Sequence, residues 1–369
     1  MLPRPPQRTV FAKFVQPDIL GEQGRLLFAV VNAFSRAGYA VSLCDNIAQE
    51  SLGKYGRLAR SLPGVNLVGE TPPDTSHTMY VYDAADPTLR GHGWRKTVRV
   101  GFDIFAPWRF SRPVLMPFPL HPSHAGPGLE SRLAALRAVP KTMRMFFSGD
   151  LKGYTQSRIR YPAPKLPRAS VVDTIRARLG DRVLFVQTQD VLDRLLDTPC
   201  PNRCVIVDTG NLWVPEGLWL DFLARTDFFL APPGIVMPMC HNAVEAMAVG
   251  AIPVVSYPEW FQPRLGSPGE CIEFGDEVDL VDKVNRVLDM APEEIAPLRA
   301  RAMAYYDTHL TSRRFVEEIE SRSESHVDAL IMMERYVAKN AKRLGRRSVL
   351  LKGADEAGRW SWLKSLAGL

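Results

Sequence analysis

Short apolar runs alternate with stretches of helical spacing along most of this chain, and no other feature constrains its fold more. Strands that alternate with helices favour a parallel sheet with helices packed on its faces. The stretch 24–38 has apolar residues at helical spacing and ends at Gly38, a residue typical of a helix C-terminus. The strand-like runs of the first part are 10–15, 39–45, 78–83 and 97–103.

A segment dense in Pro, Gly and aromatic residues interrupts this alternation between 104 and 142, and a second alternating series begins at 143–149. A chain of 369 residues is longer than one hydrophobic core usually serves, so two domains are expected. The sequence therefore predicts an α/β protein with these parts: an N-terminal Rossmann-like domain over 1–125, an interdomain linker over 126–142, a C-terminal Rossmann-like domain over 143–320 and a helical basic tail over 321–369.

The composition is that of a soluble globular protein, with 46% hydrophobic and 23% charged residues. No apolar run reaches 18 residues, and the N-terminus lacks the apolar core of a signal peptide, so a cytoplasmic location is expected. The five cysteines are scattered without zinc-site spacing, and we expect no metal site from them.

The formal charge of +6 is compatible with nucleic acid, an anionic membrane surface or a phosphate-rich ligand. No zinc-finger or RRM-type signature accompanies it, so we expect no nucleic-acid partner. The tail from about 312 to 369 becomes basic and ends near Trp360 and Trp362. A solvated helical face is one interpretation of this tail. A helix at the inner face of the membrane, which would make the protein peripheral, is the second. Contact with nucleic acid is the third.

The stretch 227–257 reads as strand, loop, helix and strand. Asn242 is placed as the helix N-cap and Glu245 at the third helical position, which is the Asn-x-x-Glu form of a capping box. In such a unit the helix N-terminus lies at the carboxyl edge of the sheet, where its backbone N–H groups favour an anion. The loop before the helix, with Pro233, Gly234 and His241, is therefore a candidate phosphate rim.

Glu245 has two interpretations at this stage. It closes the helix as a capping residue, or it faces a cleft and accepts hydrogen bonds from the two hydroxyls of a ribose. A carboxylate has two acceptor oxygens, which suit a vicinal diol.

The run HNAVEAMAVGAIPVV resembles the donor-binding segment of GT-B glycosyltransferases. With FFSG at the start of the second domain, it looks most like exostosin-like and related bacterial polysaccharide-biosynthesis transferases. The resemblance implies two Rossmann-like domains with parallel sheets facing a central cleft, and a C-terminal helix that crosses back. The C-terminal domain would bind a nucleotide-sugar donor, and the N-terminal domain a glycan or lipid-linked acceptor.

The common retaining families have a second glutamate eight residues before the first, where this chain has Met237. The resemblance therefore implies a hexosyltransferase-type enzyme for which inversion is favoured. A GT-B-like sugar-nucleotide epimerase or phosphorylase is an alternative, and a non-catalytic binding protein with the same fold is another.

A diphosphate leaving group must have its charge neutralised, and without a metal this falls to Arg, Lys and helix N-termini. No Asp-x-Asp metal motif in strand context is present, so no metal and no cofactor beyond the nucleotide-sugar co-substrate are expected. A solvated basic loop is the alternative for the segment after 143–149, and a simple helix entry for Gly21 and Gly24. The further donor-binding candidates are Gly21, Gly24, Ser148, Gly149, Lys152, Arg158 and Arg160.

Direct displacement needs a general base that deprotonates the acceptor hydroxyl. Asp103 ends one strand-like run and is the first choice, and Asp83 ends another. His121, in the segment between the domains, is the third candidate, because a neutral imidazole also accepts a proton. A turn cap is the alternative for Asp83, and loop packing for His121.

Overall fold

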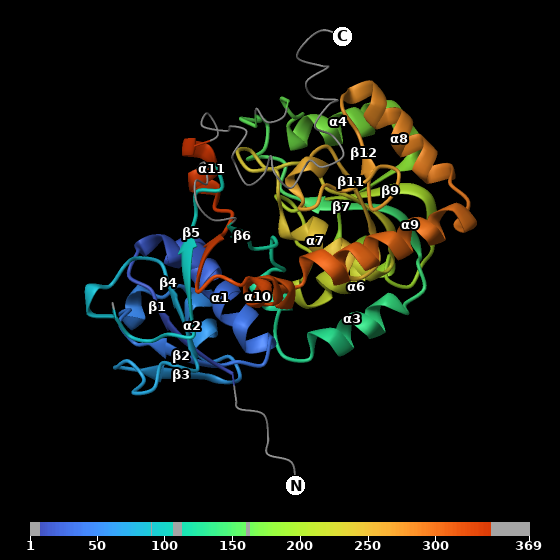
Figure 1. Ribbon diagram of the computed structural model, residues 1–369. Helices are drawn as coiled ribbons and strands as arrows, with labels where there is room; N and C mark the ends of the chain where they lie inside the picture. Colours follow the sequence, from blue (N-terminus) through green and yellow to red (C-terminus); the bar gives the residue numbers. More distant parts are fainter. Residues whose placement is uncertain (1–7, 90, 106–112, 160–162, 341–369) are drawn as a thin grey trace. The chain divides into compact units, whose positions relative to one another are not determined.

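The computed structural model describes residues 8–89, 91–105, 113–159 and 163–340 (Figure 1). These residues form two compact units. Unit 1 takes the chain up to Pro127 and then Thr311–Tyr336. Unit 2 takes Gly128–Leu310 and the described residues from Val337.

Unit 1 is built on a seven-stranded sheet in the order β3-β2-β1-β4-β5-β13-β6, whose neighbouring strands all pair in parallel. The apolar runs predicted as strands all form strands of this sheet. Its strands are β1 (Thr9–Lys13), β2 (Ala40–Cys44), β3 (Val65–Val68), β4 (Thr78–Tyr82), β5 (Lys96–Gly101), β6 (Val114–Leu115) and β13 (His326–Leu330). Its helices are α1 (Gly21–Arg36), α2 (Lys54–Arg60) and α10 (Ser312–Ser321), and α11 (Glu334–Asn340) begins in it.

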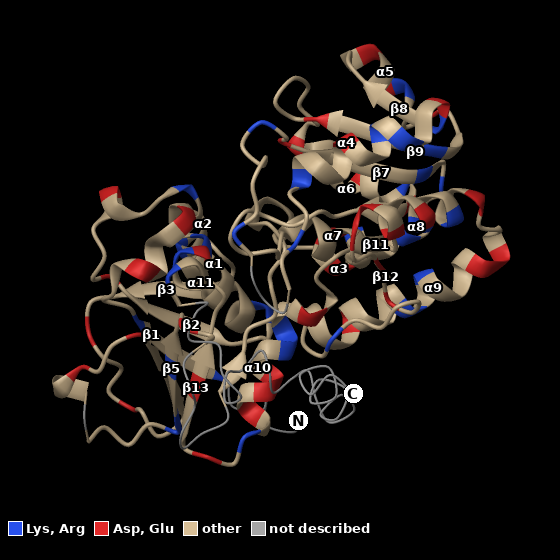
Figure 2. Cartoon of the chain, turned by 90° about the horizontal axis from the view of Figure 1, so that it is seen from above, with Lys and Arg blue, Asp and Glu red and all other residues tan. Residues whose placement is uncertain are grey.

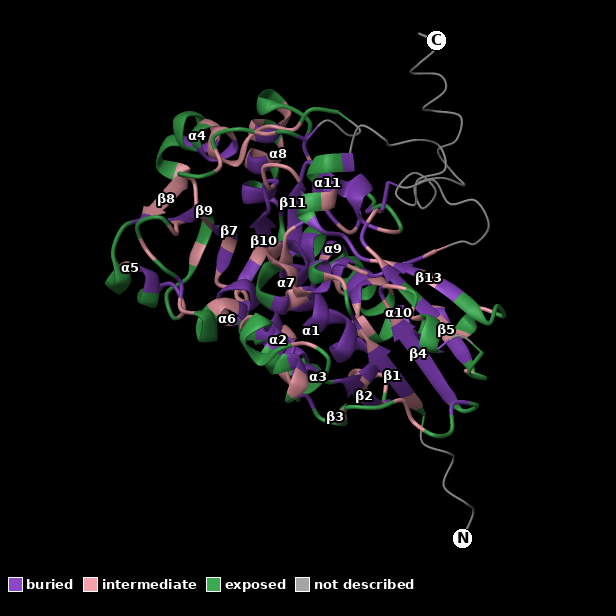
Figure 3. Ribbon diagram, turned by 90° about the vertical axis from the view of Figure 1, so that its left-hand side faces the viewer, coloured by how far each residue is buried: buried purple, intermediate pink, exposed green. Residues whose placement is uncertain are grey.

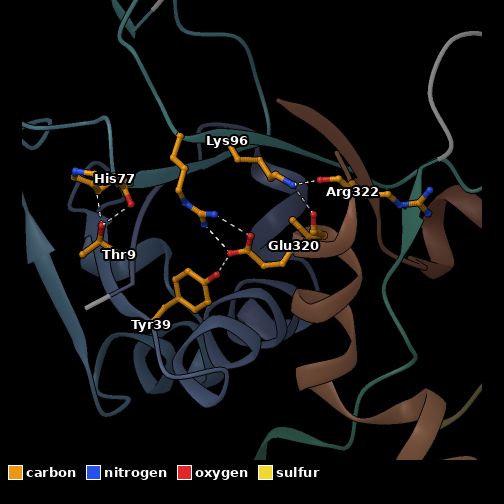
Figure 4. A network of polar contacts seen from close by, with 9 residues as sticks. Thr9, Tyr39, His77, Lys96, Glu320 and Arg322 are labelled. Atoms are coloured by element: carbon orange, nitrogen blue, oxygen red, sulfur yellow. Dashed lines mark hydrogen bonds and ion pairs between the residues drawn. The ribbon is translucent and has the colours of Figure 1, made fainter. Parts of the chain in front are cut away.

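The chain returns to unit 1 after completing unit 2. Helix α10 packs against α1, and β13 enters the sheet between β5 and β6, in register from His326 opposite Thr97. Figure 4 shows how the end of α10 is held: the buried Lys96 ammonium donates to the carbonyls of Ile319 and Arg322 at 2.9 and 2.6 Å. Glu320 accepts hydrogen bonds from the Tyr39 hydroxyl and from both terminal nitrogens of Arg95.

Unit 2 has a six-stranded parallel sheet in the order β12-β11-β10-β7-β9-β8. Its central strands are buried on both faces, as Figure 3 shows for β10 and β11. The strands are β7 (Met143–Gly149), β8 (Val183–Val186), β9 (Cys200–Asp208), β10 (Thr226–Leu230), β11 (Ile252–Val255) and β12 (Ile272–Glu273). The helices are α3 (Leu129–Arg137), α4 (Arg168–Leu179), α5 (Gln189–Arg194), α6 (Trp219–Ala224), α7 (His241–Ala248), α8 (Glu277–Asp289) and α9 (Pro292–Tyr305).

The predicted α/β fold class is confirmed, since both units have Rossmann-like parallel sheets, and helix α10, which follows unit 2 in the chain, belongs to the first unit. The predicted segment bounds need correction. The expected linker 126–142 contains helix α3, whose Leu129, Leu133 and Leu136 are buried in unit 2. The expected helical tail from 321 contains strand β13, and the chain leaves unit 2 for unit 1 after Leu310 rather than after 320.

Residues 341–369, which carry the basic run and the two tryptophans of the tail, lie outside the described residues. Over the part of the chain that is described, no helix combines the length and apolarity needed to cross a bilayer.

Candidate functional site

The order of strands in unit 2 places a topological switch point between β7 and β10. The chain leaves β7 for β8 and β9 on one side, and then continues through β10, β11 and β12 on the other. Ligands of open parallel sheets bind outside the carboxyl ends of the strands at such a point, because the two crossovers diverge there. The segments at this position are 150–159, after β7, and 231–240, after β10.

These two segments contact each other. The Arg158 backbone N–H donates to the Ile235 carbonyl at 2.6 Å. At Gly234 a side chain would collide with the Met237 carbonyl oxygen, so the turn after β10 requires glycine there. Most of the predicted donor-binding residues of unit 2 thus lie at one sheet edge, either at the end of β7 or on the two joined loops: Ser148, Gly149, Lys152, Arg158, Pro233 and Gly234.

Helix α7 begins at His241, one residue before the position predicted for its N-cap. Cys240 is the N-cap, in an extended conformation, and its side chain makes no capping hydrogen bond. Asn242 is therefore the second helical residue, and the prediction that it caps the helix is wrong. Both His241 and Asn242 are half-buried. The first turn of α7 directs its backbone N–H groups to the carboxyl edge of the sheet, where they favour an anion.

Glu245 is the fifth residue of α7, not the third, and it makes no capping hydrogen bond, so the capping-box prediction is also wrong. Its side chain is buried at 1% exposure, and its Oε2 accepts a hydrogen bond from the Trp219 indole N–H at 2.6 Å. Trp219 in turn lies against Phe146 and Phe229. Because the carboxylate is covered here, a ribose could reach it only after Trp219 or the neighbouring loop had shifted.

Sequence reasoning missed Arg168, the first residue of α4. Its guanidinium lies over the Tyr154 ring at 3.6 Å from the centroid, and its Nη1 donates to the Asp150 carbonyl at 3.2 Å. A side chain at Gly149 would lie 3.4 Å from Arg168 Nη1, which places this cation beside the end of β7. The signal available was its position: a basic residue at the start of the helix that follows the first strand of a domain.

Two further contacts fix the same edge. Lys165 and Glu259 form a buried ion pair with Nζ and Oε1 3.0 Å apart, which joins the segment after β7 to the segment after β11. Burial raises the pKa of the Glu259 carboxyl, and the Lys165 ammonium opposes that shift. The Tyr257 hydroxyl lies 3.6 Å from Cys240 Sγ, and burial raises the pKa of Tyr257 well above its usual value.

Of the predicted bases in unit 1, Asp83 has a structural role. Its two carboxylate oxygens accept hydrogen bonds from the Val15 and Gln16 backbone N–H groups, each at 2.9 Å. Burial raises the pKa of this carboxyl, although those amides oppose the shift. Because both oxygens are used to hold the loop after β1, Asp83 is a poor general base, as the turn-cap alternative expected.

Asp103 lies just after β5, at the carboxyl edge of the sheet of unit 1. It is half-buried, and its Oδ1 accepts the Phe105 N–H at 3.2 Å. The Tyr336 hydroxyl donates to Asp18 at 2.8 Å, and this hydrogen bond raises the pKa of Tyr336. The negative charge of Asp103 makes a smaller contribution in the same direction. Asp83, which follows the neighbouring strand β4, lies at the same edge, so position alone does not separate these two predicted bases.

His121 has both ring nitrogens engaged. Its Nε2 lies 3.0 Å from the Tyr55 hydroxyl, and its Nδ1 lies 2.6 Å from the Ser123 hydroxyl. These contacts match the loop-packing alternative for this histidine.

The glycines at the start of α1 serve close packing within unit 1. Gly24 has a positive φ of 82°, and a side chain there would collide with the Gly56 backbone. A side chain at Gly21 would lie 2.7 Å from Met333 Cε. A close approach of the backbone is therefore required at Gly24, whereas the atom nearest to Gly21 is the end of a flexible methionine side chain. That these glycines also approach a donor stays a prediction.

Arg160 lies outside the described residues. Within the described part of the chain, no group of three or more His, Cys, Asp or Glu side chains is arranged to hold a metal ion.

No protein-family model and no curated protein matches the chain. Solved structures match it over most of its length. HepE from Anabaena, in complex with UDP and glucose, is 14% identical, covering 85% of this chain and 98% of its own, with a TM-score of 0.40. The structure of OtsA without ligand is 10% identical, covering 86% of this chain and 100% of its own, with a TM-score of 0.44. An alpha-glucosyltransferase in complex with UDP and a 13-mer DNA is 12% identical over 85% and 98%, at 0.39.

The structure has two α/β units, each built on a parallel sheet. Two Rossmann-like units, with the chain returning to the first after the second, are the connectivity that the GT-B resemblance implied. At the identities and TM-scores above, no inference about activity follows from the likeness, and the exostosin-like resemblance stays a prediction.

Proposed function

We propose that the protein is a glycosyltransferase that moves a sugar from a nucleotide-sugar donor to a glycan or lipid-linked acceptor. The observation that carries the proposal is the switch point of unit 2. There the loops after β7 and β10 are joined, the N-cap side chain of α7 makes no capping hydrogen bond, and the Arg168 guanidinium lies beside Gly149. A helix N-terminus and an arginine together suit a diphosphate.

In the proposed reaction the acceptor hydroxyl oxygen attacks the anomeric carbon while the bond to the diphosphate breaks. A general base takes the hydroxyl proton, and we propose Asp103 for this role. The nucleoside diphosphate leaves with its new charge opposed by Arg168 and by the α7 backbone N–H groups. We further propose that this step needs no metal and proceeds with inversion, because Met237 stands where retaining families have a carboxylate.

We propose that Glu245 receives the ribose hydroxyls in exchange for the Trp219 indole. The buried carboxylate has one oxygen on Trp219, and the exchange would cost that hydrogen bond but supply new ones. We also propose that the transferred group is a hexosyl group and that the reaction belongs to polysaccharide biosynthesis. We propose that the basic tail contacts an anionic membrane surface. Both proposals rest on the sequence.

The test is turnover of a panel of UDP-, GDP- and dTDP-sugars by the full chain, with and without glycan and polyprenyl phosphate acceptors. Acceptor-dependent release of the nucleoside diphosphate, with an inverted anomeric configuration in the product, is expected. Turnover of a nucleotide sugar without acceptor, to an isomeric sugar, would make the protein an epimerase. Binding of donors without any turnover would make it a binding protein.

The variant Asp103→Asn tests the proposed general base, and Asp86→Asn is its control. Asp86 is also a carboxylate of unit 1, but it pairs with Lys13 at 2.6 Å on the surface. We expect Asp103→Asn alone to lower kcat by about a hundredfold or more with an unchanged donor KM. Equal rates in the two variants would remove Asp103 from the mechanism.

A further inference from the structure

Unit 2 contains a cavity of about 160 Å³ remote in sequence from the loops at the switch point. Helices α8 and α9 supply most of its wall, together with Ser267 and Pro268, which precede β12. Its residues on α8 follow the i, i+3, i+4, i+7 spacing of one helix face, and those on α9 follow i, i+4, i+7. They are Lys283, Arg286 and Val287 on α8 with its C-cap residue Met290, and Glu294, Leu298 and Arg301 on α9.

The floor of the cavity is apolar, because its side chains come from the core of unit 2. These side chains are almost fully buried, and together they form the inner wall of the cavity. This floor consists of Ile272, Val287, Met290 and Leu298. A cavity of roughly this volume can take a single aromatic ring.

The rim is basic. Arg286 and Arg301 stand on different helices, both are exposed, and neither has a hydrogen-bond or ion-pair partner among the described residues. Figure 2 shows the basic and acidic positions along α8 and α9. Of the other charged residues of the rim, Glu294 accepts the Ala291 N–H at 3.1 Å, and Lys283 lies 3.7 Å from Asp279.

Two guanidinium groups that flank one concavity raise the local positive potential, and their planar donor sets match phosphate and carboxylate oxygens. We propose that this cavity is a second binding site, separate from the proposed donor site, for a small amphipathic anion. Its ring-sized apolar part lies on the floor, and its phosphate or carboxylate bridges Arg286 and Arg301.

The test uses phenyl phosphate as the probe, titrated into the full chain by calorimetry, with inorganic phosphate and phenol in parallel. Saturable binding of phenyl phosphate, at least tenfold tighter than either half-probe, is expected. The double variant Arg286→Ala/Arg301→Ala should weaken that binding about tenfold or more. Arg178→Ala is the matched control, since Arg178 is another exposed arginine of unit 2 on α4, and it should bind as the unchanged protein does.

Because both rim arginines are exposed, the double variant should keep the thermal unfolding midpoint of the unchanged protein. Equal binding by the double variant and the control would overturn the proposal, as would phenyl phosphate binding no better than inorganic phosphate. Neither result would bear on donor turnover, so this site and the proposed glycosyl transfer can fail separately.

Discussion

Glu245 and Trp219 form the most consequential contact at the scale of single residues. A carboxylate at 1% exposure is costly unless donors compensate it, and the indole N–H is such a donor at 2.6 Å. The same pair fixes α6 to α7. Any ligand that uses the Glu245 carboxylate must therefore act on the Trp219 indole as well.

Trp219→Phe keeps the ring packing against Phe146 and Phe229 but removes the donor. We expect a loss of about 1–3 kcal/mol in the free energy of unfolding, because a buried carboxylate oxygen loses its hydrogen bond. Urea unfolding followed by fluorescence and circular dichroism measures it.

The control is Trp213→Phe, since Trp213 is 67% exposed in the same unit. It should change the free energy of unfolding by less than about 0.5 kcal/mol. If both variants lost the same amount, the Trp219 hydrogen bond would have no special role in stability.

The sequence identified Glu245 and the loop before it as a place of interest, but not their geometry. Asn242 is a good capping residue by type, yet the loop delivers Cys240 in the extended conformation that an N-cap needs. The partner of Glu245 lies 26 residues away on another helix. Such a contact depends on how α6 and α7 pack, which no local pattern encodes.

At the scale of elements, the two ends of α7 differ in how their backbone groups are satisfied. The side chain of its N-cap residue makes no capping hydrogen bond at the sheet edge. Its last carbonyls accept hydrogen bonds from cations: Arg137 Nε donates to the Ala248 carbonyl at 2.7 Å, and Lys141 Nζ to the Val249 carbonyl at 3.3 Å. Basic side chains at a helix C-terminus are favourable, but Lys141 is also half-buried.

Burial, reinforced by the Arg299 guanidinium, lowers the pKa of Lys141 to about 7, while Asp227 opposes the shift. Arg144 and Arg299 both pair with that same Asp227. The unfolded chain holds the Lys141 proton up to its usual pKa of 10.5, so between pH 7 and 10.5 it binds more protons than the folded chain. The Lys141 ammonium therefore lowers the free energy of unfolding by its full amount below pH 7. This destabilisation decreases as the pH rises toward 10.5.

Lys141→Met removes the half-buried charge and keeps most of the volume. We expect the variant to be more stable than the unchanged protein at pH 6, by about 1 kcal/mol or more, with the gain shrinking by pH 9. Urea unfolding at the two pH values measures this, and Lys152→Met, at an exposed lysine, is the control. A gain of the same size at both pH values would show that the effect is not due to the Lys141 charge.

Elements with strong periodicity were predictable. The run 227–232 forms β10, whose apolar residues are buried on both faces of a parallel sheet. The run 97–103 forms β5, in which buried residues alternate with more exposed ones such as Arg99. Strand β13 was missed because His326–Leu330 alternates polar and apolar residues within a segment that looked helical and basic. Its pairing partners, β5 and β6, lie more than 200 residues earlier in the chain.

At the scale of the whole molecule, the return of residues 311–336 completes unit 1. Strand β13 pairs with β5 over five residues and is the described neighbour of β6. Val327, Ala329 and Ile331 are buried, and Lys96 holds the end of α10. The sheet of unit 1 therefore depends on chain that is synthesised after all of Gly128–Leu310.

Truncation after Arg322 tests this dependence. Removing β13 leaves β5 with an unpaired edge and exposes its apolar neighbours, so we expect loss of cooperative unfolding of unit 1 and aggregation. Truncation after Asn340 is the control, because it keeps every described element. If both truncated chains unfolded with the same midpoint and amplitude in urea, β13 would not be required for unit 1.

The central claim is that the switch point of unit 2 binds a nucleoside diphosphate. Calorimetric titration with UDP, GDP and dTDP, on the unchanged protein and on Arg168→Ala, tests it most directly. We expect saturable binding of at least one of the three, weakened tenfold or more by Arg168→Ala and unaffected by Arg178→Ala. Binding of none of them, or equal weakening by the two substitutions, would contradict it.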